Sequence, residues 1–183
     1  ELAKRITKPL LIDSKGLTAF FEDLEILRNR KGATILLPRL EEMSSITSQS
    51  RTEIDEHIVD ITQVTAAHLN SIIVLKGTPS LIALPDRRVF INRNRISGIA
   101  PINSSAVLTN TIAGIYFQEV PLDEAVRHGV FICGLAGELT LQAKSDGGIT
   151  TENILDYLPL AHKMFREGLS QEMEDPTIGI HPI

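Results

Sequence analysis

The sequence has little of several residue types, and each shortage narrows the class of protein. It contains one cysteine, no tryptophan and only 4% aromatic residues, so it forms no internal disulfide and offers few rings for stacking on a base. Lysine and arginine together number 18 against 23 acidic residues, which gives a net charge of −5. A surface that binds nucleic acid needs clustered positive charge. The composition therefore argues against nucleic-acid binding.

Long apolar segments are also missing. Apolar runs such as those at 10–12 and 72–75 are far shorter than the roughly 20 residues that a membrane-spanning helix needs. No secretory signal or transit segment is recognisable, and a single cysteine suits a reducing compartment. We expect a cytoplasmic protein without a membrane partner. At 183 residues, 43% of them hydrophobic, the chain is long enough for one domain with its own core.

Short strands alternate with longer helices in the hydrophobic pattern. Continuous apolar runs predict strands at 8–13, 33–37 and 71–76, and a hairpin that joins 80–84 to 88–92. Helical spacing predicts helices at 17–30, 39–46, 50–70 and 151–166, one around 107–116, and one that starts at Pro121. This alternation is typical of an α/β fold with a mainly parallel sheet covered by helices. We expect a single domain at 1–168 and a poorly ordered tail at 169–183.

In such sheets ligands bind beyond the carboxyl ends of the strands. Asp13 follows the first predicted strand, and Lys76 and Gly77 follow the third. Asn103, Ser104 and Ser105 open a predicted helix, whose free backbone N–H groups can hold an anion. Each feature also has a purely structural interpretation, because serines commonly cap helices and a lysine at a strand end is commonly solvated.

Neither a metal site nor a reactive thiol is indicated. The five histidines do not fall at metal-ligand spacing, so we expect no metal. Cys133 lies inside a predicted helix with no nearby basic residue in the sequence, which favours a structural thiol over a nucleophile. The residues alone indicate an α/β domain with a candidate anion site.

Three segments, in this order, resemble a known family: KPLLID at 8–13, IIVLKGTPSLIALPDRRVFIN at 72–92 and VRHGVFICGLAGEL at 126–139. They are similar to the ADP/ATP-dependent NAD(P)H-hydrate dehydratases, a ribokinase-like branch often labelled carbohydrate kinase. The resemblance runs from about Lys8 to Gly168. It implies a ribokinase-like three-layer α/β sandwich, a lyase that removes water from hydrated NADH or NADPH, and ADP or ATP as the nucleotide.

The sequence departs from the family's pattern where the pattern carries chemistry. The family's G-[ST]-G-D motif, in which glycines form an anion hole and the aspartate is the catalytic base, falls on 103–106, so its acid is replaced by Ala106. A methyl group accepts no proton, and general-base chemistry is lost there. Ile102, at the preceding glycine position, resists the close approach of an anion to the backbone.

Other family positions are partly kept. Asp13 retains the first acid of DADAL and Glu42 the last acid of HPGE, whereas the asparagine of GNPG falls on Ile96. The resemblance marks as substrate-cleft candidates Asp13, Glu42, Asn92 and Gly98. It marks as nucleotide or anion candidates Lys76, Gly77, Asn103, Ser104 and Ser105.

The family's domain extends further at its N-terminus, whereas this sequence opens at Glu1 without a methionine. We expect the N-terminal portion of the sheet to be missing: either this sequence is a fragment of a longer chain, or a second copy or a partner chain covers the open edge. Three functions stay open: a degenerate dehydratase-like protein that binds a nucleotide or acts as a subunit, an active dehydratase, and a small-molecule or sugar kinase. The altered motifs favour the first.

Overall fold

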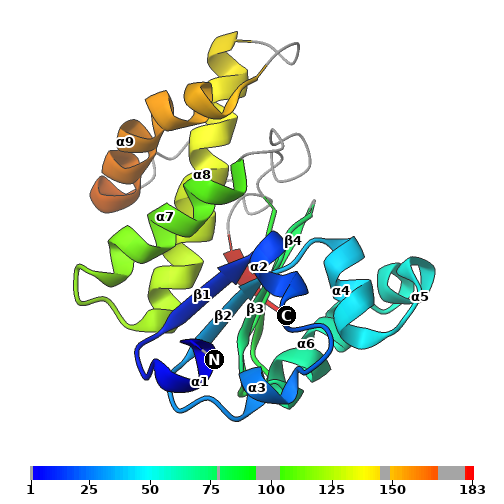
Figure 1. The fold of residues 1–183 in the computed structure, drawn as a ribbon. Coiled ribbons are helices and arrows are strands. Elements are labelled where there is room, and N and C mark those ends of the chain that lie inside the picture. Colours follow the sequence, from blue (N-terminus) through cyan, green and yellow to red (C-terminus); the bar gives the residue numbers. More distant parts are fainter. Residues whose placement is uncertain (1, 78, 94–103, 145–148, 169–179) are drawn as a thin grey trace. The chain divides into compact units, whose positions relative to one another are not determined.

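The computed structural model describes residues 2–77, 79–93, 104–144, 149–168 and 180–183, and Figure 1 traces their course. The chain forms two compact units. Unit 1 comprises residues 1–91 with 182–183, and unit 2 comprises 92–181. Each unit has its own hydrophobic core, and each is described by itself.

The sheet is mixed and mostly built by unit 1. Its strand order is β1 (Leu10–Asp13), β2 (Thr34–Leu37), β3 (Ile72–Leu75), β4 (Ser80–Ala83), β5 (Val89–Asn92) and β6 (Ile180–Pro182). Strands β1, β2 and β3 are parallel, and β4 runs antiparallel to β3. Every residue of β2, β3 and β4 is buried, as expected for strands that read as continuous apolar runs. The predicted α/β class and the three parallel strands are confirmed.

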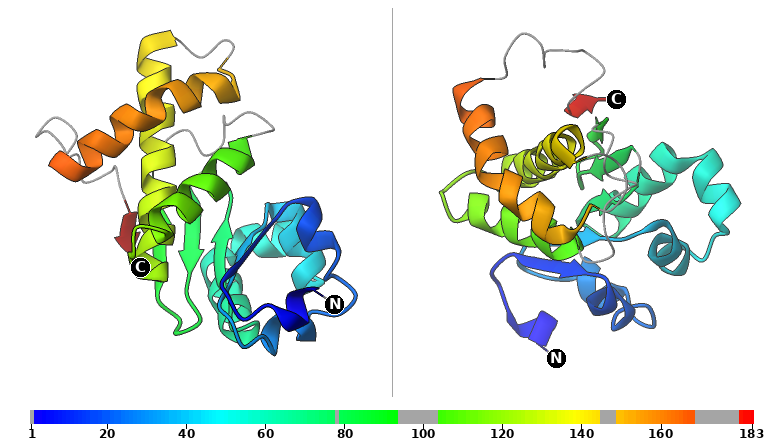
Figure 2. Two further views of the ribbon diagram at one scale, coloured as in Figure 1. Left: turned by 60° about the vertical axis from the view of Figure 1, so that its left-hand side comes forward. Right: turned by 90° about the horizontal axis from the view of Figure 1, so that it is seen from above.

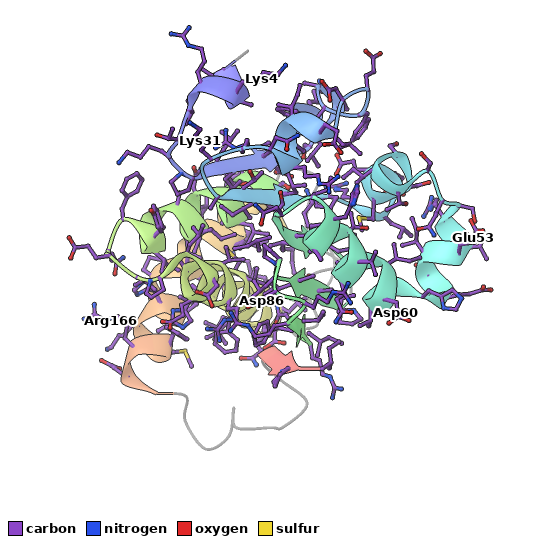
Figure 3. All side chains as sticks on the ribbon, turned by 90° about the horizontal axis from the view of Figure 1, so that it is seen from below. Lys4, Lys31, Glu53, Asp60, Asp86 and Arg166 are labelled. Atoms are coloured by element: carbon purple, nitrogen blue, oxygen red, sulfur yellow. The ribbon has the colours of Figure 1, made fainter. Side chains whose placement is uncertain are left out.

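Six helices belong to unit 1: α1 (Leu2–Arg5), α2 (Lys15–Thr18), α3 (Glu25–Arg28), α4 (Leu40–Thr47), α5 (Arg51–Glu56) and α6 (Ile58–His68). Helix α6 packs against β3 and β4 (Figure 1). The core between helices and sheet contains fully buried side chains from both, among them Leu36, Met43, Ile54 and Ile73. Charged side chains such as Glu53, Asp60 and Asp86 extend outward (Figure 3).

The predicted helix at 17–30 is wrong. Two single-turn helices, α2 and α3, occupy its ends, and the chain between them makes tight turns. There the amide N–H groups of Phe20, Phe21 and Asp23 bond carbonyls three residues back, instead of four as in an α-helix. The apolar spacing is still used, because Phe20, Phe21 and Leu24 pack against the unit 1 core.

The predicted helix at 50–70 is present but broken. Ser50 caps α5 by accepting a hydrogen bond from the Glu53 N–H at 3.2 Å. At His57 the backbone leaves the helical region (φ −128°, ψ 34°), and α6 begins at the next residue. Ile58 and Val59 follow the break, and their β-branched side chains lower helix propensity at this point.

A buried arginine attaches the first residues to the rest of unit 1. The Arg30 guanidinium donates to the hydroxyl of Thr34 at 3.0 Å, to the carbonyl of Lys8 at 2.9 Å and to the carbonyl of Ala3. Burial lowers the pKa of Arg30. Gly32 lies so close that a Cβ added to it would come within 2.3 Å of the Thr7 carbonyl oxygen. Residues 3–8 are therefore packed tightly against the segment that leads into β2.

Unit 2 consists mainly of α7 (Ser104–Tyr116), α8 (Leu122–Lys144) and α9 (Thr151–Glu167), seen from two further sides in Figure 2. The predicted helices at 107–116 and 151–166 and the start at Pro121 are confirmed. Helices α7 and α8 approach closely at Gly129, where an added Cβ would lie 2.5 Å from Ile112 Cγ1. The unit 2 core is apolar, with Ile132, Leu135, Ala136 and Ala161 almost fully buried.

The end of the chain differs from the prediction. Residues 180–182 form β6, and the N–H of Ile183 donates to the carbonyl of Val89 at 3.0 Å, so these residues are ordered on the sheet and are not a loose tail. The rest of the predicted tail lies outside the described residues. None of the helices in the described part of the chain has the length and apolar character needed to cross a bilayer.

Candidate functional site

The carboxyl ends of β1, β2 and β3 meet at one edge of unit 1. The strands are parallel, with Asp13 in register with Leu37, so the residues that follow them are neighbours. The N–H of Lys76 donates to the carbonyl of Pro38 at 2.8 Å and holds the chain after β3 against the chain after β2. Of the predicted candidates, Asp13, Lys76 and Gly77 lie at this edge, and Glu42 lies in the first turn of α4, the helix that follows β2.

Two of these candidates form an ion pair. Lys76 Nζ lies 2.5 Å from Asp13 Oδ1, and the two side chains are only 14% and 15% exposed. Since β2 lies between β1 and β3, the pair spans the end of β2. The Ser14 hydroxyl donates to the same carboxylate oxygen at 3.1 Å. Lys76 is therefore paired with an acid of the same chain and is mostly buried. The interpretation of Lys76 as a solvated lysine at a strand end is wrong.

Ser14, directly after the ion pair's aspartate, has an unusual backbone. Its φ is 45° and its ψ is −122°, a combination that side chains with a Cβ rarely adopt. The sequence gives no sign of this backbone conformation, since a serine after a strand is common. Strained residues of this kind cluster at functional sites, where the surrounding structure holds them in place.

Glu42 and Gly77 have structural roles in unit 1. A carboxylate oxygen of Glu42, in the first turn of α4, accepts the N–H of Arg39 at 2.7 Å and so caps the helix. The carbonyl of Gly77 accepts the hydroxyl of Ser80 at 3.0 Å, which closes the turn between β3 and β4. These bonds account for both residues without a ligand.

Asn92 belongs to unit 2 and is 1% exposed. Its Nδ2 donates to the carbonyl of Val130 in α8 at 3.5 Å, and its Oδ1 has no hydrogen-bond partner among the residues that the structure describes. An amide oxygen buried in this way costs free energy unless something donates to it. Asn92 thus ties the end of β5 to α8 and keeps one acceptor unused.

The candidate anion site at the start of α7 is described only in part. Ser104 is the first residue of α7, and the carbonyl of Ser105 accepts the Thr109 hydroxyl at 2.9 Å within the helix. Ala106 lies on the exposed side of the first turn. Gly98 and Asn103 lie outside the described residues. The methyl group of Ala106 is therefore exposed to solvent at the position where the family resemblance predicts a carboxylate.

Cys133 has the properties of a structural thiol. It packs against the apolar core of unit 2, and burial raises its pKa to about 12, an effect that the Thr111 hydroxyl partly offsets. A thiol with this pKa is almost wholly protonated at neutral pH and is a poor nucleophile. Within the described residues, no group of three or more His, Cys, Asp or Glu side chains is placed to hold a metal ion.

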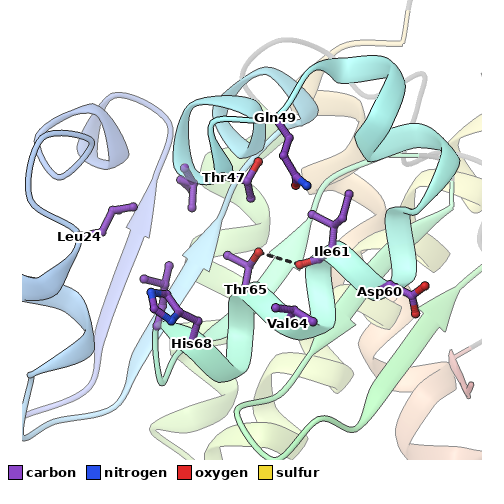
Figure 4. Close-up of a pocket in the computed structure, with 10 residues that line it drawn as sticks. Leu24, Thr47, Gln49, Asp60, Ile61, Val64, Thr65 and His68 are labelled. Carbon is purple, nitrogen blue, oxygen red and sulfur yellow. Dashed lines mark hydrogen bonds between the residues drawn. The ribbon is translucent and has the colours of Figure 1, made fainter.

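A separate groove of about 490 Å³ lies on unit 1 between α4, α6 and Leu24 (Figure 4). Ile46, Ile61, Val64 and Leu69 give it apolar walls, and Asp60 and His68 belong to its lining. The Thr65 hydroxyl donates to the carbonyl of Ile61 at 2.6 Å and has no proton left for a ligand. None of the predicted site residues lines this groove.

The family model for NAD(P)H-hydrate dehydratase matches residues 1–160. The chain belongs to the NAD(P)H-hydrate dehydratase family. The match confirms the resemblance seen in the sequence motifs. It extends to the first residues, so α1 and the segment attached by Arg30 are part of the family domain.

Relatives within the family are longer than this chain. A bifunctional NAD(P)H-hydrate repair enzyme from Thermofilum pendens is 37% identical over 182 residues, which cover all of this chain and 35% of that protein. An ADP-dependent (S)-NAD(P)H-hydrate dehydratase from Neisseria meningitidis is 24% identical, over 94% of this chain and 58% of its own length. This chain thus spans a third to somewhat over half of such relatives.

Solved structures of similar fold include a member of the same family. The Bacillus subtilis ADP/ATP-dependent NAD(P)H-hydrate dehydratase, co-crystallised with ATP and Mg²⁺, has a TM-score of 0.74 at 24% identity and covers 86% of this chain and 55% of its own. A ribokinase-like superfamily protein from Enterococcus faecalis has a TM-score of 0.68 at 22% identity, over 84% of this chain and 52% of its own. At this identity the likeness shows the fold, which is ribokinase-like as predicted.

Proposed function

We propose that this chain is a dehydratase-like protein that lacks dehydratase catalysis and retains binding of a nucleotide phosphate. The observation that carries the first part is Ala106. It occupies the exposed first turn of α7, where the family motif would provide the catalytic aspartate. Elimination of water requires a base that accepts a proton, and a hydrocarbon side chain cannot act as one.

The proposal of nucleotide binding rests on the edge of unit 1. Lys76 supplies a cation at the carboxyl ends of parallel strands, where phosphate-bearing ligands bind in sheets of this class. A Bacillus subtilis relative was crystallised with ATP and Mg²⁺, which supports an adenine nucleotide as the ligand. In this chain Lys76 would contact a phosphate group. With few aromatic residues available, the base would lie against aliphatic side chains.

We also propose that this chain acts as a subunit of an assembly. Strand β1 is the first strand of the sheet and pairs only with β2 among the described strands. An edge strand with one unpaired side can accept a further strand from another chain. Size-exclusion chromatography with light scattering tests this, and a monomer at all concentrations without a co-purifying chain would contradict it.

Catalysis is tested by incubating the purified protein with NADPH hydrate and either ADP or ATP and following the absorbance of restored NADPH. We expect no turnover above the buffer blank. The triple variant Ile102→Gly, Ser105→Gly, Ala106→Asp reintroduces the catalytic aspartate and two of the family's glycines, and the same variant with Asn at 106 is the matched control. Turnover by the wild-type chain would show that it is an active dehydratase and that the proposal is wrong.

Nucleotide binding is tested separately by thermal unfolding with ADP, ATP, NAD and NADP. A ligand that binds only the native state stabilises it by about 2.7 kcal/mol when present at a hundred times its dissociation constant. We expect ADP and ATP to raise the melting temperature. No rise with any of the four would remove the binding part of the proposal and leave the catalytic part intact.

A further inference from the structure

The positive charge at the carboxyl edge of unit 1 is already neutralised by an acid. Lys76 Nζ lies 2.5 Å from Asp13 Oδ1, and both side chains are more than four-fifths buried. A phosphate that approaches Lys76 must share its ammonium group with the Asp13 carboxylate or displace that carboxylate. In both cases two negative groups compete for one cation in a poorly solvated place, and their mutual repulsion opposes binding.

We propose that Asp13 is a built-in competitor that lowers the affinity of this edge for anionic ligands by occupying Lys76. The proposal rests on the proposed binding of a nucleotide phosphate and specifies what limits it. The ligand class is a phosphate or pyrophosphate group, free or as part of a nucleotide. When such a group binds, the Lys76 ammonium turns to it and the Asp13 carboxylate is released toward solvent.

The backbone beside Asp13 supports an exchange of this kind. Ser14 is held at φ 45° and ψ −122°, and its hydroxyl donates to the same Asp13 oxygen that Lys76 contacts. Two donors, the Lys76 ammonium and the Ser14 hydroxyl, therefore converge on one carboxylate oxygen, and the second belongs to a residue in an unfavourable conformation.

The test is a double-mutant cycle read by the affinity for pyrophosphate and for ADP, measured by isothermal titration calorimetry at fixed ionic strength. Asp13→Asn removes the competing charge and should tighten binding about 5- to 150-fold, the usual range for coupling between two sites. Lys76→Met should weaken binding without abolishing it. In the Lys76→Met background, Asp13→Asn should then tighten binding much less, because the competition acts through Lys76.

Asp86→Asn is the matched control. It also removes one acid from unit 1, but that carboxylate bonds Arg88 in the turn between β4 and β5 at 2.7 Å. Its effect on anion affinity should be within twofold. Equal tightening by Asp86→Asn and Asp13→Asn would overturn the proposal, since both effects would then arise from net charge. The proposal would also be overturned if Asp13→Asn tightened anion binding as much in the Lys76→Met background as in the wild-type chain.

The two proposals fail in distinguishable ways. If the wild-type chain binds ADP and Asp13→Asn binds it no more tightly, the competition is refuted and nucleotide binding stands. If only Asp13→Asn binds, the competition is supported and the wild-type chain is not a nucleotide-binding protein. If neither binds pyrophosphate or ADP, both proposals are wrong. Circular dichroism checks that each variant is folded, and Asp13→Ser serves as the second variant if Asp13→Asn does not fold.

Discussion

Asp13 and Lys76, 63 residues apart in the chain, join β1 to the end of β3 through one contact of 2.5 Å. Loss of one partner from a mostly buried pair leaves the other charge uncompensated. We expect Lys76→Met to lower the free energy of unfolding by about 2–3 kcal/mol, measured by urea denaturation. The exposed pair of Arg28 and Glu25 is the comparison, and Arg28→Met should leave stability nearly unchanged. Similar losses from both variants would contradict this.

Two glycines in unit 2 should respond to alanine in opposite directions. A Cβ at Gly129 would lie 2.5 Å from Ile112 Cγ1 and 3.1 Å from its Cα, so α7 and α8 would have to separate. Gly129→Ala should cost about 1–3 kcal/mol as an overpacked contact. Gly114 lies in α7 with nothing within 4 Å of an added Cβ, and Gly114→Ala should stabilise by about 0.5–1 kcal/mol. Urea midpoints of both variants measure the difference, and a shift of the same sign in both would contradict the packing of α7 on α8.

The stability of the protein should fall in mild acid because of His128. Burial, followed by the nearby Arg127, lowers the pKa of His128 below its ordinary value of 6.5, and Glu124 opposes this in part. Its ring centroid lies 4.6 Å from that of Phe165 in α9. Because the unfolded chain takes up the proton more readily, the contribution is constant above about pH 7 and is lost as the pH falls below 6.5. His128→Gln should flatten this part of a plot of melting temperature against pH, and an unchanged profile would contradict the assignment.

Cys133 should be inert toward alkylating reagents in the native protein. With the pKa of this thiol raised to about 12, only about one molecule in ten thousand carries the thiolate at pH 8. Iodoacetamide should therefore label Cys133 slowly in buffer. It should label it rapidly in about 8 M urea, in which the protein is unfolded. Mass spectrometry measures both rates. Fast labelling of the native protein would show that the thiol is accessible and ionised.

Strands β1 to β5 were predictable from the sequence, whereas strand β6 and the short helices α2 and α3 were not. Continuous apolar runs specify the buried parallel strands directly, since each residue faces a covering layer. The stretch at 17–30 has helical apolar spacing, but Phe20, Phe21 and Leu24 reach the core from successive tight turns. Spacing alone does not distinguish these turns from a helix. Strand β6 was missed because its pairing with the sheet edge at Val89 is a tertiary effect.

The sequence predicted where the residues of the candidate site lie, but not which of them contact one another. Asp13 and Lys76 were each expected at the carboxyl edge because they follow strands, and the edge is where they lie. Their pairing depends on the register of three strands, which local sequence does not specify. The strain at Ser14 leaves no trace in composition, and the capping role of Glu42 follows only once α4 is seen to start at Leu40.

The Arg30 contacts determine where this domain can be shortened. Ala3 and Lys8 supply two of the three acceptors of a guanidinium that is 8% exposed. A version that begins at β1 would keep every strand of the sheet. It would nevertheless bury the Arg30 guanidinium without two of its three hydrogen-bond acceptors. Expression boundaries chosen from the sheet alone would therefore yield poorly folded protein, and a negative binding result from such protein would say nothing about the edge formed by Asp13 and Lys76.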